Sequence, residues 1–331
     1  MARKVFLHTQ LSTFSTYHSQ GALGVLCMQN PSIYNWLLNN TTSIECSKRF
    51  LKGFTSPEVV IPKSTIYDVP CVDSLWMPCK FFDGHVHGII RNILDRGYYV
   101  GYSHIDDYYI PDKTWYKEKH FTHDGLICGY DQEKKTYSLF AYDKNWVYRV
   151  FDIPQKSLGK GIESGLKLGY TTNITALKAK PDRIALEPKT ILANIRSYLS
   201  QNIESNPVEK DSRVTGTAVH DYIGMYLDIL YKGTFAHKYT DQRIFRFLWE
   251  HKKCMYDRIK AVEDFYNLDY ALSNEYKGVV QLADKARLLY AMYTKNERKE
   301  LIASVKELLC EFHNKEIETL NKFVELLERN V

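Results

Sequence analysis

Two hydrophobic patterns divide the chain. Up to about residue 180, short stretches rich in aromatic and β-branched residues predict strands among short helices. The strand-like stretches are residues 97–110, 147–153 and 170–181. Beyond Pro188, apolar residues recur at helical spacing over 189–203, 216–233, 241–266 and 300–327. The change of period predicts an α+β protein in which a core, residues 1–185, precedes a helical part, residues 186–331.

The turn signals add detail to this outline. The polar stretch 201–213 predicts a loop between two of the late helices. Asn30 and Pro31 suit the cap and the first position of an early helix over 32–40. Cys27 lies just before that start, where the positive end of a helix can acidify a thiol. The alternative is that Cys27 is a small buried apolar residue, as most free cysteines are.

A hairpin is predicted within "HFTHDGLICGYDQEKKTYSLFAYDKNW", residues 120–146. Residues 131–135 form a polar loop of a usual hairpin length. Symmetric pairing around this loop places His123 directly opposite Asp143, with the two side chains on one face. Gly125, two residues after His123, leaves room on that face.

A histidine held by a carboxylate can act as a general base, because the acid fixes its tautomer and stabilises the imidazolium. The chain order Cys27, His123, Asp143 matches a papain-like arrangement of nucleophile, base and orienting acid. The alternative is a surface hydrogen bond between His123 and Asp143 with no catalytic part.

A metal site is the competing interpretation of the histidines. Five of them fall within forty residues: His85, His87, His104, His120 and His123. "HVH" would place two rings on one face of a strand, but zinc needs three or four converging ligands and no spacing here fits. We therefore expect no metal, and we expect Cys71 and Cys79 to be core or loop residues.

Composition narrows the class of protein. The 331 residues carry a net charge of +5, which is too weak to indicate nucleic-acid binding. No apolar run is long enough for a signal peptide or a membrane span. The seven cysteines form no CxxC pair, so we expect reduced thiols in the cytoplasm.

The run "YYIPDKTWYKEKHFTHDGLICGYDQEKKTYSLFAYD" resembles a segment of the butirosin-type acyltransferases. These papain-fold proteins are found beside nonribosomal peptide and aminoglycoside assembly lines. The elements that carry the resemblance are Tyr108–Pro111, His123, Gly129–Asp131 and Asp143. The segment 247–259, "FLWEHKKCMYDRI", is also similar to a helix of this family.

The resemblance implies a papain-like core of helices and antiparallel sheet with an added C-terminal helical part. It implies transfer of a peptide-like or thioamidated acyl chain from a carrier-protein thioester to a small amine or diamine. Cys27 would form the acyl-enzyme, His123 would be the base and Asp143 would orient it. The 4′-phosphopantetheine thioester would come with the carrier protein, with no cofactor bound. Gln20 would be the oxyanion donor, although it lies one residue further from the cysteine than the family spacing.

Residues near the hairpin are candidates for binding substrate. Asp106, Asp107 or Asp124 could hold the cationic end of a diamine, and Tyr108 and Trp115 could wall the acyl channel. The alternatives are exposed loop acids and ordinary strand packing. Two other functions use the same sequence features: a cysteine peptidase or thioester hydrolase, and a non-catalytic binding module of an assembly line. We expect no nucleic-acid or membrane partner.

Overall fold

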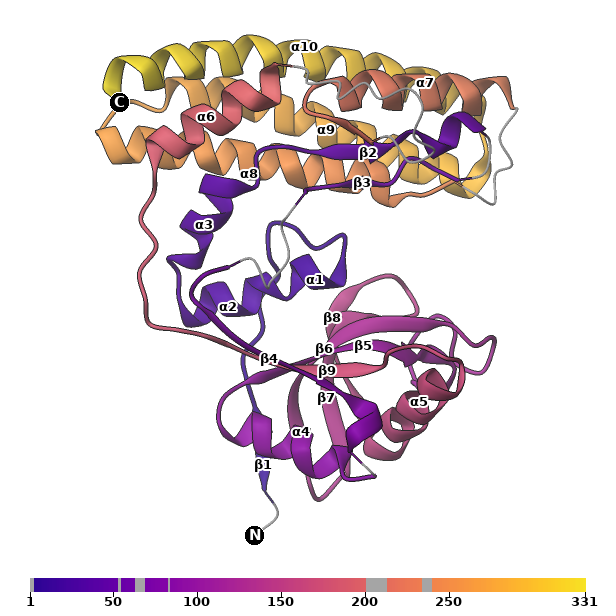
Figure 1. The fold of residues 1–331 in the computed structure, drawn as a ribbon. Helices are drawn as coiled ribbons and strands as arrows, with labels where there is room; N and C mark the ends of the chain where they lie inside the picture. The colour runs from indigo at the N-terminus through magenta and orange to yellow at the C-terminus, as the bar shows by residue number, and fades with distance from the viewer. Residues whose placement is uncertain (1–2, 53–54, 63–68, 83, 201–212, 234–239) are drawn as a thin grey trace. The chain divides into compact units, whose positions relative to one another are not determined.

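The computed structural model describes residues 3–331 except 53–54, 63–68, 83, 201–212 and 234–239. The chain folds into two compact units (Figure 1). The sheet unit comprises residues 1–33 and 65–183, and the helical unit comprises residues 34–64 and 184–331. The sequence assigned residues 34–64 to the core, but they pack with the late helices. The predicted loop at 201–213 lies almost wholly outside the described residues.

An antiparallel sheet forms the centre of the sheet unit. Its strand order is β4-β9-β5-β6-β7-β8, and β1 pairs with the end of β6. The strands are β1 (Lys4–Phe6), β4 (Val72–Pro78), β5 (Tyr99–Asp106), β6 (Thr122–Asp131), β7 (Thr136–Tyr142), β8 (Tyr148–Pro154) and β9 (Asn173–Ala179). The predicted strands at 97–110, 147–153 and 170–181 correspond to β5, β8 and β9.

Helices α4 (Val86–Asp95) and α5 (Gln155–Lys167) pack on one face of this sheet. Ile90, Leu94 and Leu158 from these helices are buried against apolar side chains of β5 to β9. The "HVH" motif therefore does not lie on a strand: His85 precedes α4 and His87 lies in its first turn. Helices α1 (His18–Gly21) and α2 (Leu23–Gln29) contact β6 and β9 respectively.

The predicted hairpin is β6–β7, but its register is not uniform. Next to the turn Asp131 pairs with Thr136, one residue away from the predicted pairing. An irregularity between Ile127 and Gly129 then restores the predicted register, so that Leu126 pairs with Phe140. Beyond Leu126, β6 pairs only with β5 on its other side, where His123 faces Ile105.

The helical unit consists of helices with one small sheet. Strands β2 (Glu45–Ser47), β3 (Val59–Val60) and β10 (Arg213–Thr215) form that sheet. Helix α3 (Ile33–Asn40) leads into the unit. The later helices are α6 (Pro188–Leu199), α7 (Ala218–Lys232), α8 (Arg243–Tyr266), α9 (Ala271–Asn296) and α10 (Lys299–Asn330). Within the described parts of the chain, no helix is both long and apolar enough to cross a membrane.

Candidate catalytic site around His123

His123 lies at the start of β6 and is held by Asp107. Its Nδ1 is hydrogen-bonded to the Asp107 carboxylate, which follows the end of β5 directly and is 1% exposed. An irregular pairing between Tyr102 and Ile105 shifts β5 against β6 and brings Asp107 beside the ring. Since a carboxylate accepts the Nδ1 proton, Nε2 carries the lone pair and is the nitrogen left for proton transfer. The side chain of His123 is 29% exposed, so the ring is partly open to solvent.

Other polar groups surround Asp107 in the interior. Lys113 Nζ lies 3.9 Å from the Asp107 carboxylate, and burial lowers the pKa of Lys113 although Asp107 and Asp124 oppose this shift. Burial, together with Asp107 and Asp124, raises the pKa of Tyr102 well above its usual value. A Cβ on Gly125 would come within 2.5 Å of the Tyr102 hydroxyl, so the room expected beside His123 is filled by this ring. These contacts fix Asp107 and His123 in one arrangement.

The prediction that Asp143 orients His123 is wrong, because Asp107 holds the ring instead. Asp143 follows the end of β7 and closes the turn to β8: its carboxylate accepts hydrogen bonds from the amides of Asn145 and Val147. Arg149 Nε donates to the other oxygen at 2.6 Å. Burial alone would raise the pKa of Asp143, but the Arg149 hydrogen bond and the backbone amides lower it. The carboxylate is occupied within its own turn.

Cys27 does not lie at the start of a helix. It is the fifth residue of α2, which ends at Gln29. Burial, with the nearby Cys71 thiol, raises the pKa of Cys27 to about 12. At pH 7 a thiol with this pKa is ionised to roughly one part in 10⁵, which is the opposite of an activated nucleophile. Cys27 is only half-buried, but its place within α2 and its raised pKa fit the alternative of an apolar packing residue better than that of a nucleophile.

The predicted diamine-binding acids are mostly engaged in the fold. Asp106 is fully buried and accepts hydrogen bonds from His120 and Ser164, each at 2.6 Å. Asp107 holds His123, so neither acid is open to a cationic substrate. Asp124 is half-buried and accepts a hydrogen bond from the amide of His104 at 3.3 Å.

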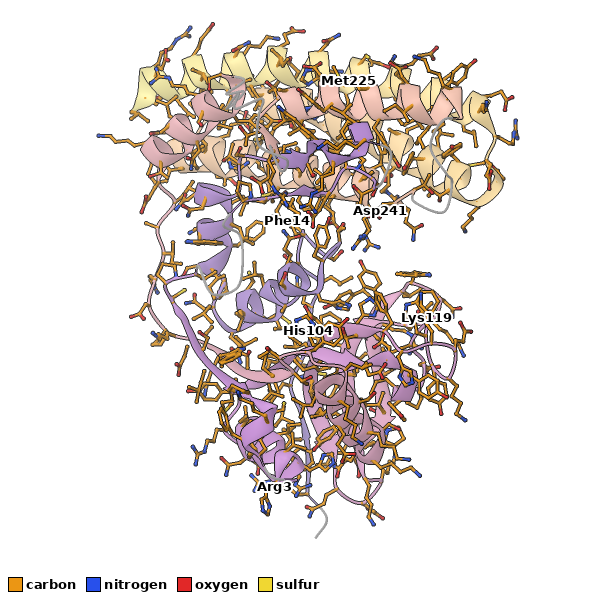
Figure 2. All side chains as sticks on the ribbon, turned by 45° about the vertical axis from the view of Figure 1, so that its right-hand side comes forward. Arg3, Phe14, His104, Lys119, Met225 and Asp241 are labelled. Atoms are coloured by element: carbon orange, nitrogen blue, oxygen red, sulfur yellow. The ribbon has the colours of Figure 1, made fainter. Side chains whose placement is uncertain are left out.

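Aromatic side chains lie next to the exposed side of His123. The Phe121 ring centroid is 4.6 Å from that of His123, and the Trp115 ring lies 6.0 Å from Phe121. Lys119, labelled in Figure 2, places its ammonium 3.6 Å from the Trp115 ring. Tyr108 instead stacks on His120, at 4.4 Å between centroids. Of the two predicted wall residues, Trp115 belongs to the cluster that includes His123.

His18 also belongs to this site, although no sequence pattern indicated it. It begins α1, and its ring centroid is 6.1 Å from that of His123. Burial lowers its pKa well below the usual value, and the charges of Lys113 and His123 add to the effect. Gln20, the predicted oxyanion donor, is a buried residue of the same short helix.

One group elsewhere has the composition of a metal site. Among the described residues, His220 of α7 lies near His313 and Glu316 of α10. The two imidazole rings are stacked, with centroids 4.4 Å apart and planes 23° apart. Because the lone pair of an imidazole lies in its ring plane, nearly parallel rings do not converge on one ion. Glu316 also accepts a hydrogen bond from Lys252 at 2.7 Å, so these side chains form a polar network in the interior of the helical unit.

No family model matches the chain, and no curated protein matches it.

Proposed function

We propose that the sheet unit catalyses transfer of an acyl group from a carrier-protein phosphopantetheine thioester to a small amine or diamine. Asp107 and His123 form the general base, and the amine attacks the thioester directly, without an acyl-enzyme on Cys27. The fold under this proposal is a papain-like core in a cytoplasmic enzyme. The resemblance around the hairpin supplies the reaction class, and the site supplies the roles of the residues.

The contact between Asp107 and His123 carries the proposal. A buried carboxylate on Nδ1 fixes the tautomer that presents the Nε2 lone pair, and it stabilises the imidazolium that forms when Nε2 takes a proton. The ring of His123 is partly exposed, as the mechanism requires of a group that takes a proton from a bound amine. The aromatic residues Trp115 and Phe121 beside it offer an apolar surface to the acyl chain and can limit access of water.

The acyl transfer needs no reactant other than the thioester and the amine. The neutral amine attacks the thioester carbonyl, a C–N bond forms, and the amine proton passes to His123 Nε2. The tetrahedral intermediate then collapses, the C–S bond breaks, and the departing thiolate takes the proton from His123. The amide is more stable than the thioester, so the transfer is downhill. Direct attack suits the raised pKa of Cys27, which leaves very little thiolate.

Three variants test this assignment with benzoyl-pantetheine thioester and 1,4-diaminobutane as substrates. His123→Ala is expected to lower the rate of amide formation by about 10²–10⁴-fold, the usual contribution of a general base. Asp107→Asn should lower it by about 10²-fold or more, because it presents the wrong tautomer. Cys27→Ala should keep the wild-type rate to within about threefold, since general base catalysis does not need the thiol.

The products separate the proposal from its competitors. Amide and free acid are measured by mass spectrometry at increasing diamine concentration. Saturable formation of amide supports the transferase. Free acid at every diamine concentration would identify a thioester hydrolase, and no product of either kind would favour a non-catalytic binding module. Loss of activity in Cys27→Ala, together with an acyl adduct on Cys27 in the wild type, would restore the covalent route.

A further inference from the structure

His18 and His123 form a pair of imidazoles at the candidate site. Their ring planes are 61° apart in an edge-to-face contact. The His18 ring is also 5.5 Å from both Tyr142 and Tyr148. All these residues belong to the sheet unit, so their arrangement is a property of one folded body. His123 accepts the amine proton, and a second group is needed to stabilise the negative charge that forms on the carbonyl oxygen.

The surroundings of His18 favour a neutral ring with its proton on Nε2. Nδ1 of His18 is buried and has no hydrogen-bond partner among the described residues. A buried N–H without an acceptor is rarer in proteins than an unsatisfied lone pair. The tautomer with a bare Nδ1 is therefore the better one here, and it makes Nε2 a donor. Burial and the charge of Lys113 lower the pKa of His18, which keeps the ring uncharged at neutral pH.

We propose that His18 is a catalytic residue whose Nε2–H donates a hydrogen bond to the thioester carbonyl oxygen while His123 removes the amine proton. This role rests on the proposed acyl transfer. As the C–N bond forms, the π electron pair of the carbonyl moves onto oxygen, and the donor stabilises that charge without giving up its proton. A neutral imidazole polarises a carbonyl in the same way in triosephosphate isomerase. His18 thus takes the role that the family resemblance implied for Gln20.

A nucleophilic role for His18 is the alternative within the same site. An unprotonated imidazole can attack a thioester and carry the acyl group on nitrogen. The direct attack of the amine assigns His18 the donor role instead, because the bare nitrogen, Nδ1, is buried and Nε2 carries the proton. A covalent adduct on His18 would therefore contradict the proposal.

Two matched substitutions test which nitrogen acts. The amide nitrogen of Gln can approach the position of Nε2, whereas that of Asn approaches the position of Nδ1. We expect His18→Gln to keep kcat for benzoyl-pantetheine and 1,4-diaminobutane within about tenfold, because it keeps the donor. We expect His18→Asn and His18→Leu to lower kcat by about 10²–10³-fold with little change in KM. The shape of the kcat profile against pH should be the same in wild type and His18→Gln, because the donor at this position keeps its proton throughout the reaction.

The controls distinguish failure of this inference from failure of the proposed function. Circular dichroism melting of each variant checks that the fold is kept. If His123→Ala is inactive but His18→Leu turns over like the wild type, the donor role is wrong and the acyl transfer stands. If His18→Gln is as inactive as His18→Leu, or an acyl adduct forms on His18, the donor role is also overturned. If the wild type makes no amide, both proposals fail together.

Discussion

At the scale of single residues, burial decides which side chains of the sheet unit can react. Cys27 and His18 lie within ten residues of each other. Burial lowers the pKa of His18 and raises that of Cys27, so it favours the neutral form of both side chains. The consequences are opposite. A neutral thiol is a poor nucleophile, whereas a neutral imidazole remains a hydrogen-bond donor.

The low reactivity of Cys27 can be measured directly. At pH 7.5 we expect iodoacetamide to modify the exposed Cys310 well before Cys27, because the pKa of about 12 leaves Cys27 almost entirely as the thiol. Peptide mapping by mass spectrometry over time gives the order. Denatured protein is the control, since both thiols should then react at similar rates. Labelling of Cys27 before Cys310 in the folded chain would show that the thiol is activated after all.

The sequence identified His123 but not its partner. His123 could be selected because it precedes an apolar strand that leads into a clear turn. Asp107 could not be selected in this way. β6 lies in the middle of the sheet and pairs with both β5 and β7, but the hairpin pattern predicts only the pairing with β7. Asp106 and Asp107 lie within the predicted strand 97–110 and were candidates for binding substrate. Only the pairing of β5 with β6 shows that they hold His120 and His123.

At the scale of elements, the contact between β5 and β6 depends on Gly125. We expect Gly125→Ala to lower the free energy of unfolding by about 1–3 kcal/mol, since its Cβ would lie 2.5 Å from the Tyr102 hydroxyl and force the strands apart. Amide formation should fall as well, because His123 lies two residues away on the same strand. Urea denaturation of wild type and variant measures the change in stability.

Gly88→Ala is the matched control for this substitution. No atom lies within 4 Å of the position of its Cβ, and Gly88 is an exposed residue of α4. Alanine is favoured over glycine in helices, so we expect stability to stay the same or to rise by up to about 1 kcal/mol. Equal effects of the two substitutions would mean that the close approach of Tyr102 to Gly125 does not constrain the sheet.

Long periodic elements could be predicted, and elements with weaker patterns could not. The segments 189–203, 216–233, 241–266 and 300–327 correspond to α6, α7, α8 and α10. Helix α9 was missed because its apolar residues do not keep to one face: Leu288 and Met292 are exposed, whereas Tyr276 and Tyr290 are buried. The hairpin was found, but an irregularity near Cys128 changes its register, and no sequence rule placed it there.

At the scale of the whole molecule, the helical unit is built from two separate pieces of chain. Residues 34–64 supply β2, β3 and most of α3, and buried groups of α8 depend on them. Arg258 Nε donates to the carbonyl of Leu38 at 2.5 Å, and His251 Nε2 is 2.8 Å from the carbonyl of Thr42. Without these carbonyls, α8 would bury a guanidinium group with fewer acceptors, which is costly.

Fragments test this dependence. A fragment of residues 184–331 is expected to melt without a sharp transition, because Arg258 and His251 lose their partners in residues 34–64. The same fragment joined to residues 34–64 through a glycine–serine linker should melt cooperatively. Circular dichroism at 222 nm against temperature compares the two. Cooperative melting of the shorter fragment at the same temperature would show that the first piece of chain is dispensable for this unit.

The division of the helical unit into two pieces has a consequence during synthesis on the ribosome. Residues 34–64 emerge early, but α8 follows only after all of residues 65–183 have been made. At about 5–20 residues per second, the interval between residue 64 and residue 258 is roughly 10–40 s. Phe50 and Val59 are both buried in the finished protein, but during that time they have neither Tyr226 of α7 nor α8 to pack against. A nascent chain of this protein therefore offers a short apolar segment to chaperones while the sheet unit folds behind it.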